Sequence, residues 1–355
     1  MSRPPRHPLI PLRDGVSASC VALPQPPAGT RPWPGVLDFL AQRLPRLTPH
    51  EWAQRLARGE VLDEAGQPVP PDAPYRGGTR LYYWRTLDDE AVVPFEEQVL
   101  FQDEHLVVAD KPHFLPVTPG GRYVQQTLLV RLKNRLGLPD LSPVHRIDRE
   151  TAGLVVFSVR AQDRGAYQAL FRERTVGKVY EAIAPFDPAQ PFPQVRCSRI
   201  EEDKSTFFRT SEVPGEPNSE TRIRMLEQRG AWARYRLEPL TGKRHQLRVH
   251  MAALGLPLVG DQFYPTVRRG PAAAEDFADP LRLLASFSVG DVMGVLLRCA
   301  GPKDRCSAAL VRKQARVWMW RHHKHSLAGR ASQLVAAEGA GASCTGLFST
   351  RMRGV

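Results

Sequence analysis

The stretch HRIDRETAGLVVFSV, residues 145 to 159, runs from a dense cluster of charged side chains directly into an apolar segment. The segment LVVFSV has the length and composition of a buried β-strand. Charged side chains beside a buried strand are costly unless they are paired or exposed, so the cluster indicates the rim of a cleft. A carboxylate between Arg146 and Arg149 stays ionised and oriented, which makes Asp148 a candidate nucleophile or general base. A surface loop with incidental ion pairs is the alternative interpretation.

A second charged cluster, TGKRHQLRVHMAALG, covers residues 241 to 255 and has the spacing of a helix that ends at its last glycine. On such a helix His245 and Arg248 lie on one stripe, and Gln246 and His250 lie on another. Arg248 could pair with an acid from elsewhere in the chain. Alternatively, this basic face only coats the surface or meets phosphate.

Tyr180 is a third candidate, in the alternating segment GKVYEAIA, which predicts a strand. Taken alone, a strand tyrosine fills a core more often than it performs chemistry. The chain has neither the GxxxxGK nor the GxGxxG pattern, so phosphoryl and hydride transfer lack their usual machinery. The histidines of HHKH, residues 322 to 325, have no acidic or cysteine ligand at useful spacing, which favours a basic tail over a metal site.

Length and composition favour two domains with tails, since the chain has 355 residues, of which 42% are hydrophobic and 24% are charged. We expect a cytoplasmic protein, because no apolar run is long enough to cross a bilayer and the N-terminus does not resemble a signal peptide. Five scattered cysteines support neither a disulfide framework nor a zinc site. The net charge of +12 suggests an anionic partner. However, residues 286–355 hold 11 basic and 3 acidic side chains, so that this tail alone contributes +8.

The first 34 residues contain nine prolines and are expected to form an extended arm without regular structure. Two short helices follow, VLDFLAQRL and EWAQRLARGEV, and then strands. A basic face that could track phosphates, or could simply be solvated, is expected on these helices, formed by Arg43, Arg46, Arg55 and Arg58. Further along, TLLVRLKNRLG and residues 161–174 predict helices, while LVVA and ARYRLEPL predict strands.

Together these motifs resemble the RluA-type family of RNA pseudouridine synthases. The family signature is His-Arg-Leu/Ile-Asp, followed two residues later by Thr-Ser/Ala-Gly and an apolar strand, and HRIDRETAGLVVFSV matches it. Three further blocks occur in the family's order: DKPHFLPVTPGG, GKVYEAIA and TGKRHQLRVHMAALGLPLVGDQFY. The resemblance covers approximately residues 95–284. Residues 33–87 are similar, more faintly, to the S-four-type RNA-binding domain that often precedes this catalytic domain.

The resemblance implies an α+β fold, with a catalytic domain at residues 91–285 built on a mixed, mostly antiparallel sheet. A small S-four-like RNA-binding module is expected at residues 33–90, preceded by a Pro-rich arm at residues 1–32. Residues 286–355 depart from the family pattern, so we expect an atypical basic tail that is poorly ordered. If the family's closing strand is missing there, one edge of the sheet is left uncovered.

The resemblance also implies a role for each candidate residue. Asp148 is the expected nucleophile, attacking either the anomeric carbon of the sugar or the base ring, and Arg248 forms the ion pair that keeps it ionised. Tyr180 stacks on the target base. Arg146 enters the space that a flipped nucleotide vacates, and His145 has a positioning role. The other residues expected to bind substrate are Arg149, Thr151, His245, Gln246 and His250.

The implied reaction converts specific uridines in structured rRNA or tRNA to pseudouridine. It needs no cofactor, because the base detaches, turns and rejoins through carbon without net redox change or consumption of water. We therefore expect a metal-free monomer whose partner is RNA and which has no membrane association. A catalytically inactive RNA-binding protein is the alternative, while a metal-dependent nuclease would need more carboxylates near His145 than the sequence provides.

Overall fold

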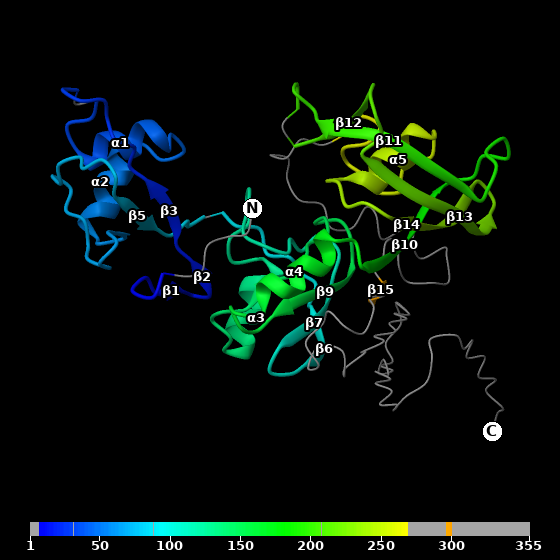
Figure 1. The fold of residues 1–355 in the computed structure, drawn as a ribbon, viewed down its shortest axis with the longest axis horizontal. Helices are drawn as coiled ribbons and strands as arrows, with labels where there is room; N and C mark the ends of the chain where they lie inside the picture. The colour runs from blue at the N-terminus through cyan, green and yellow to red at the C-terminus, as the bar shows by residue number, and fades with distance from the viewer. Residues whose placement is uncertain (1–6, 31, 88, 207, 269–295, 300–355) are drawn as a thin grey trace.

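The computed structural model describes residues 7–30, 32–87, 89–206, 208–268 and 296–299. Figure 1 shows three parts along the chain: an N-terminal part in blue, a central part in cyan and green, and a third part in green and yellow. In the portion of the chain that is described, no helix is both long and apolar enough to span a membrane.

The N-terminal part packs two helices against a three-stranded sheet. Its α2 helix begins with a reciprocal cap, because the Thr48 hydroxyl accepts from the Glu51 backbone N–H at 3.3 Å and the Glu51 carboxylate accepts from the Thr48 N–H at 2.6 Å. Phe39, Leu40 and Trp52 form the centre of its core. The elements are β1 (Leu12–Arg13), β2 (Val16–Ser17), β3 (Ser19–Ala22), α1 (Val36–Arg43), α2 (Pro49–Ala57), β4 (Val61–Leu62) and β5 (Arg80–Tyr83), with the sheet order β3-β5-β4.

Two expectations for this region were wrong. The proline-rich stretch does contain regular structure, since β1 pairs with β2 and β3 joins the sheet through β5. These strands lie between the prolines, so their donors remain available. Arg55 does not contribute to an exposed basic face, because it is 8% exposed and donates to the Trp84 carbonyl at 2.8 Å and to the Thr86 hydroxyl.

The central part contains a four-stranded sheet in the order β6-β7-β9-β8. β7 and β9 lie in the middle, and their apolar residues, such as Val107 and Phe157, are fully buried with Leu128 and Leu132 of α3. The helix α3 ends at Gly137, whose φ of 66° is the left-handed conformation that favours glycine. The elements are β6 (Gln98–Gln102), β7 (Leu106–Lys111), α3 (Leu128–Leu136), β8 (Ser142–Pro143), β9 (Gly153–Ser158) and α4 (Arg164–Arg172).

The third part contains a six-stranded sheet in the order β12-β11-β13-β14-β10-β15, against which α5 packs. Leu247 and Met251 of α5 contact Ala182 and Tyr235 in the core beneath the helix. The elements are β10 (Val176–Pro185), β11 (Gln194–Glu202), β12 (Thr210–Val213), β13 (Ser219–Arg229), β14 (Trp232–Pro239), α5 (Gln246–Ala253) and β15 (Leu296–Cys299).

The α+β class with mostly antiparallel sheets is confirmed. The tail from residue 286 was expected to be poorly ordered, yet its residues 296–299 form β15, which pairs antiparallel with Val176–Val179 of β10 and covers that part of the sheet edge. All other residues of the tail, 286–295 and 300–355, lie outside the described residues. The helix predicted for residues 241–255 begins only at Gln246, so the preceding TGKRH segment is a loop.

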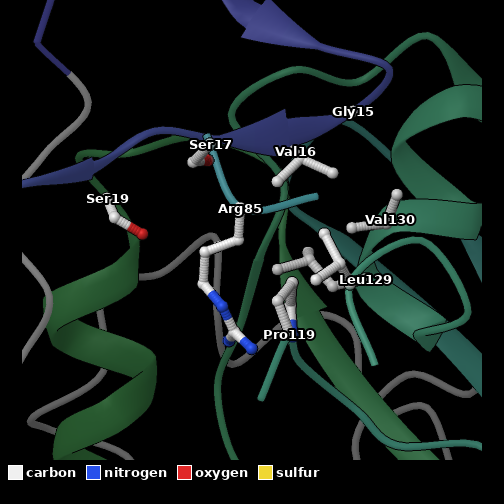
Figure 2. Close-up of a pocket in the computed structure, with 9 residues that line it drawn as sticks. Gly15, Val16, Ser17, Ser19, Arg85, Pro119, Leu129 and Val130 are labelled. Atoms are coloured by element: carbon white, nitrogen blue, oxygen red, sulfur yellow. The ribbon is translucent and has the colours of Figure 1, made fainter. Parts of the chain in front are cut away.

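The N-terminal part and the central part share a small apolar core. Val16 and Trp84 from the first contact Val124 and Val130 from the second within one buried cluster. Beside this cluster lies a cavity of about 150 Å³ (Figure 2), along which the side chain of Arg85 extends toward Pro119. The N-terminal part is therefore packed against the same segment that leads into α3.

Candidate active site

A cleft of about 800 Å³ contains most of the residues that the sequence singled out. Its walls come from residues 144–149 before β9, from Tyr180 on β10, and from residues 241–248 at the start of α5. The structure therefore places candidates from both sheets of the catalytic region around one space. The predicted residues that line it are His145, Arg146, Asp148, Arg149, Thr151, Tyr180, His245, Gln246 and Arg248.

Asp148 lies in the turn that precedes β9. Its backbone carbonyl accepts from the Thr151 N–H at 3.2 Å, while the neighbouring Ile147 side chain is buried in the core of the four-stranded sheet. Its carboxylate stays 29% exposed and faces Arg248, whose Nη1 lies 3.3 Å from Oδ2. The fold thus fixes the backbone of Asp148 and leaves its carboxylate open to the cleft.

Arg248 is held mainly by an acid that the sequence interpretation did not name. Its Nε and Nη2 donate to the two carboxylate oxygens of Asp261, each at 2.7 Å, and both side chains are almost fully buried. Asp261 in turn accepts from the N–H groups of Phe263 and Tyr264. Burial alone would lower the pKa of Arg248, but the bond to Asp261 and the charges of Asp261, Asp148 and Glu150 raise it. Arg248 is therefore a permanent cation aimed at Asp148.

Glu150 adds a second carboxylate to the same cluster. Its Oε2 lies 3.7 Å from Nη1 of Arg248, and its Oε1 accepts from Nε of Arg149 at 3.0 Å. Burial alone would raise the pKa of Glu150, but the two arginines outweigh it and lower the pKa to about 2. Glu150 is thus ionised at neutral pH and cannot donate a proton to a substrate.

Tyr180 lies on β10, opposite Leu237 of β14, and packs against the cores of both sheets. Burial, and next the charge of Asp148, raise the pKa of its phenol. The phenol is therefore protonated at neutral pH and can donate a hydrogen bond into the cleft.

His145 is built into the wall of the cleft. Its Nε2 accepts from the Val156 N–H at 3.2 Å, and its ring stacks on Phe171 with a centroid distance of 4.5 Å and an interplanar angle of 14°. Burial, and next the charge of Lys178, lower the pKa of His145 to about 3, so the ring is neutral. By contrast, Arg146 is exposed at the cleft, and Arg149 donates to the Tyr123 hydroxyl at 3.1 Å.

Lys111 holds the backbone next to Asp148 in place, a role that the sequence interpretation did not predict. Its ammonium is fully buried and donates to the carbonyls of Pro112, Leu115 and Arg149 at 2.7–3.1 Å. Burial lowers the pKa of Lys111 to about 7. Since Arg149 follows Asp148, these bonds join the end of β7 to the turn that carries the candidate nucleophile. The signal was present in LVVADKP, where Asp110 and Lys111 end an apolar run directly before a proline.

Two residues expected to bind substrate, His250 and Gln246, instead use their side chains in hydrogen bonds within the protein. His250 is fully buried and is not among the cleft residues; its Nδ1 lies 2.9 Å from the Thr221 hydroxyl, and its Nε2 lies 3.0 Å from the hydroxyls of Ser198 and Ser219. Gln246 borders the cleft, but Thr241 and Lys243 donate to its oxygen, and its amide donates to two acceptors on β13. Both side chains join α5 to the sheet, because a helix over a sheet must satisfy its buried polar groups.

Comparison with known proteins identifies the family. The family model for RNA pseudouridylate synthase matches residues 105–253. An uncharacterized RNA pseudouridine synthase of Synechocystis sp. is 34% identical over 232 residues, which cover 64% of this chain and 79% of that protein. The dual-specificity RNA pseudouridine synthase RluA of Vibrio cholerae is 32% identical, covering 53% of this chain and 74% of that protein. The chain belongs to the RluA-type family of RNA pseudouridine synthases.

This RNA pseudouridine synthase is thus an isomerase that acts on RNA. The ribosomal large subunit pseudouridine synthase D of Haemophilus influenzae is 30% identical, covering 64% of this chain and 71% of that protein. Among solved structures, human RNA pseudouridylate synthase domain containing 1 aligns with a TM-score of 0.45 and 23% identity, covering 59% of this chain and 80% of that one. Asp148, Tyr180 and Arg248 all lie within the residues that the family model matches.

Proposed function

We propose that this synthase isomerises specific uridines in rRNA or tRNA, with Asp148 as the nucleophile. The contact of 3.3 Å between Arg248 Nη1 and Asp148 Oδ2, inside the cleft that Tyr180 also lines, carries the proposal. The buried guanidinium places a positive charge beside the carboxylate, and the partial exposure of Asp148 leaves it accessible to a substrate. The names of relatives support the substrate class, since they include a ribosomal large subunit pseudouridine synthase and a tRNA pseudouridine(31) synthase.

The reaction is balanced without an added reactant. The bond between N1 of uracil and C1′ of ribose breaks, the base turns within the cleft, and C5 forms the new bond to C1′. C5 then loses its proton and N1 gains one, so that the product is an isomer of the substrate. The attack by Asp148 on either C1′ or the base ring would begin this sequence.

The other residues of the cleft fit supporting roles in this proposal. Tyr180 would stack on the target base, and its protonated phenol would donate to a substrate group beside that base. Arg146, exposed at the cleft, would occupy the space that a flipped nucleotide leaves in its stack. His145, fixed by Val156 and Phe171, would position the turn that carries Asp148.

The test maps pseudouridines in total RNA from a strain that lacks its own copy of this protein, after incubation with the purified full-length chain. We expect a new site with the wild-type protein, no modification with Asp148→Asn, and unchanged modification with the exposed matched control Asp72→Asn. Thermal unfolding of each variant shows whether it is folded. Binding without modification by the wild type would support an inactive RNA-binding protein instead, and full activity of Asp148→Asn would exclude Asp148 as the nucleophile.

A further inference from the structure

His245 is held so that one particular edge of its ring faces the catalytic cleft. Its Nδ1 lies 2.9 Å from the hydroxyl of Tyr264. That hydroxyl accepts from the Thr210 N–H at 2.9 Å and donates to the Thr210 carbonyl at 3.0 Å. The single hydrogen of the Tyr264 phenol has the Thr210 hydroxyl at 3.2 Å as a further neighbour, but that hydroxyl donates its own hydrogen to the Arg244 carbonyl at 3.0 Å. With the phenol hydrogen on the Thr210 carbonyl, which can only accept, Nδ1 of His245 is the donor in its bond to Tyr264.

The ring is therefore neutral, with its hydrogen on Nδ1 and a free lone pair on Nε2. Burial lowers the pKa of His245 to about 4, in agreement with this bonding pattern. The ring cannot easily turn, because the side chain is 9% exposed and meets Tyr264 edge to face at 5.7 Å. The backbone adds a further restraint, since His245 has a φ of 56° and immediately precedes α5.

The lone pair on Nε2 faces a second acceptor across a short gap. Nε2 lies 4.0 Å from Oδ2 of Asp148, a distance too long for a hydrogen bond. With the ring hydrogen on Nδ1, Nε2 also has no hydrogen to donate to Asp148. The nearby charges are those of Asp148, Arg248, Arg244 and Glu150. Of these, Arg248 donates its hydrogen bonds to Asp261 and Asp148. Two acceptors side by side at the wall of a cleft are complementary to a donor on the substrate.

We propose that Nε2 of His245 accepts a hydrogen bond from an O–H or N–H group of the target uridine, beside the position at which Asp148 reacts. This inference rests on the proposed role of Asp148 as the nucleophile. Uridine offers two such donors: the ribose 2′-hydroxyl, which distinguishes RNA from DNA, and N3–H of the ring, which cytosine lacks. His245 is in either case a specificity-determining residue, because a substrate without the donor leaves the buried lone pair unpaired.

Two substitutions separate the hydrogen bond from the packing of the ring. Phe in His245→Phe fills similar space but accepts no hydrogen bond, whereas Gln in His245→Gln can place an amide oxygen near the position of Nε2. Both residues carry a similar cost in the left-handed conformation, so the comparison between them reports the acceptor. Leaving a buried polar group unpaired costs about 1–3 kcal/mol, which corresponds to a loss of roughly 5- to 150-fold in kcat/KM for His245→Phe. We expect His245→Gln to recover most of that loss.

The substrate arms of the experiment identify the donor. Short synthetic RNAs spanning the mapped site carry uridine, 2′-deoxyuridine or 3-methyluridine at the target position, and kcat/KM is measured for the wild type and for His245→Phe. If the proposal holds, removal of one donor lowers wild-type kcat/KM, and His245→Phe causes no further loss on that RNA. An equal loss from His245→Phe on all three RNAs, or none on the uridine RNA, would overturn it. Failure of the proposed nucleophile is recognised separately, because Asp148→Asn would then remain active.

Nitrogen-15 NMR of the full chain provides a measurement that does not depend on catalysis. At pH 7 we expect Nδ1 of His245 to be protonated and Nε2 to be unprotonated, and Tyr264→Phe to abolish that fixed tautomer. A wild-type spectrum with the hydrogen on Nε2 would contradict the proposal, because the ring would then present a donor to the cleft.

Discussion

Arg248 gives two of its three nitrogens to Asp261, at 2.7 Å each, and reaches Asp148 only with the third, at 3.3 Å. Asp261 is therefore the carboxylate that anchors Arg248, whereas Asp148 is the carboxylate beside which Arg248 places its charge. Planar, bidentate pairs of this kind fix the orientation of a guanidinium more strongly than a single contact does. As a result, the charge beside Asp148 is positioned before any RNA binds.

Asp261→Asn should consequently impair a reaction in which Asp261 takes no direct part. The neutral amide leaves the buried Arg248 without its main counter-ion, and removing one partner of a buried pair typically costs about 3–5 kcal/mol of folding stability. Arg248 would also be free to turn toward Asp148 and Glu150, so we expect kcat to fall by roughly 100-fold in the molecules that stay folded. Chemical denaturation and single-turnover kinetics measure the two effects. Loss of stability with unchanged kcat would show that Asp261 has only a structural role.

Tyr180→Phe tests whether the phenol acts in its protonated form. Because burial and the charge of Asp148 raise the pKa of Tyr180, tyrosinate should not form between pH 7 and 9.5. We therefore expect Tyr180→Phe to lower kcat by a similar factor, on the order of 100-fold, at every pH in this range. Tyr75→Phe, in the N-terminal part, is the matched control. A wild-type rate that rises with pH, and does so only while the hydroxyl is present, would indicate that tyrosinate is the active form.

Sequence patterns predicted those parts of the fold in which local signals and tertiary structure agree. The helix over α3 follows from leucines at helical spacing and a glycine at its C-terminus, and β9 and β10 follow from apolar content and alternation. Asp148, Tyr180 and Arg248 could be grouped because each lies in a motif with characteristic neighbours. Their common place in one cleft is a property of the fold.

Other features depend on distant contacts that no local pattern encodes. The pair between Arg248 and Asp261 requires the chain to turn back after α5. Nothing in the local sequence GDQFY indicates that Asp261 pairs with Arg248. Similarly, Arg55 has the spacing of an exposed helix position, yet its guanidinium is buried and donates a hydrogen bond to the carbonyl of Trp84. The sequence of residues 241–245 is compatible with a helix, so a helix was predicted there. In the structure His245 adopts a left-handed backbone conformation, and the helix begins only after it.

The neutral ring of His145 in the wall of the cleft predicts a loss of stability in acid. Its pKa is about 3 in the folded chain, against 6.5 for an ordinary histidine, so the unfolded chain binds an extra proton between these values. The free energy of unfolding should therefore decrease as the pH falls below about 6.5. His250 and His245 contribute in the same direction, since burial lowers the pKa of each to about 4.

His145→Gln isolates the part of this effect that belongs to one ring, because glutamine can still accept from the Val156 N–H. We expect the dependence of unfolding free energy on pH, measured by denaturation between pH 4 and 6, to become shallower by close to one proton, which is ~1.4 kcal/mol per pH unit. An identical slope in His145→Gln and the wild type would show that His145 titrates normally in the folded chain.

Glu90 should control the segment that joins the N-terminal part to the cleft. Its carboxylate accepts from three consecutive backbone N–H groups, those of residues 124–126, at 2.6–2.9 Å. The same segment is gripped upstream by Arg85, which donates to the Gly121 carbonyl at 2.7 Å, and further upstream it lines the cleft at Val117 and Thr118. Movement of this segment would therefore change one wall of the active site.

Glu90→Gln tests this link by replacing two acceptor oxygens with one. At least one of the three N–H groups then loses its partner, which typically costs about 1–3 kcal/mol. We expect faster hydrogen exchange at residues 124–126, together with a fall in kcat/KM of roughly tenfold. Glu96→Gln removes the same charge from an exposed position a few residues away and should change neither quantity. Faster exchange with full activity would mean that Glu90 stabilises the segment without shaping the cleft, whereas unchanged exchange would show that its three bonds do not hold the segment in solution.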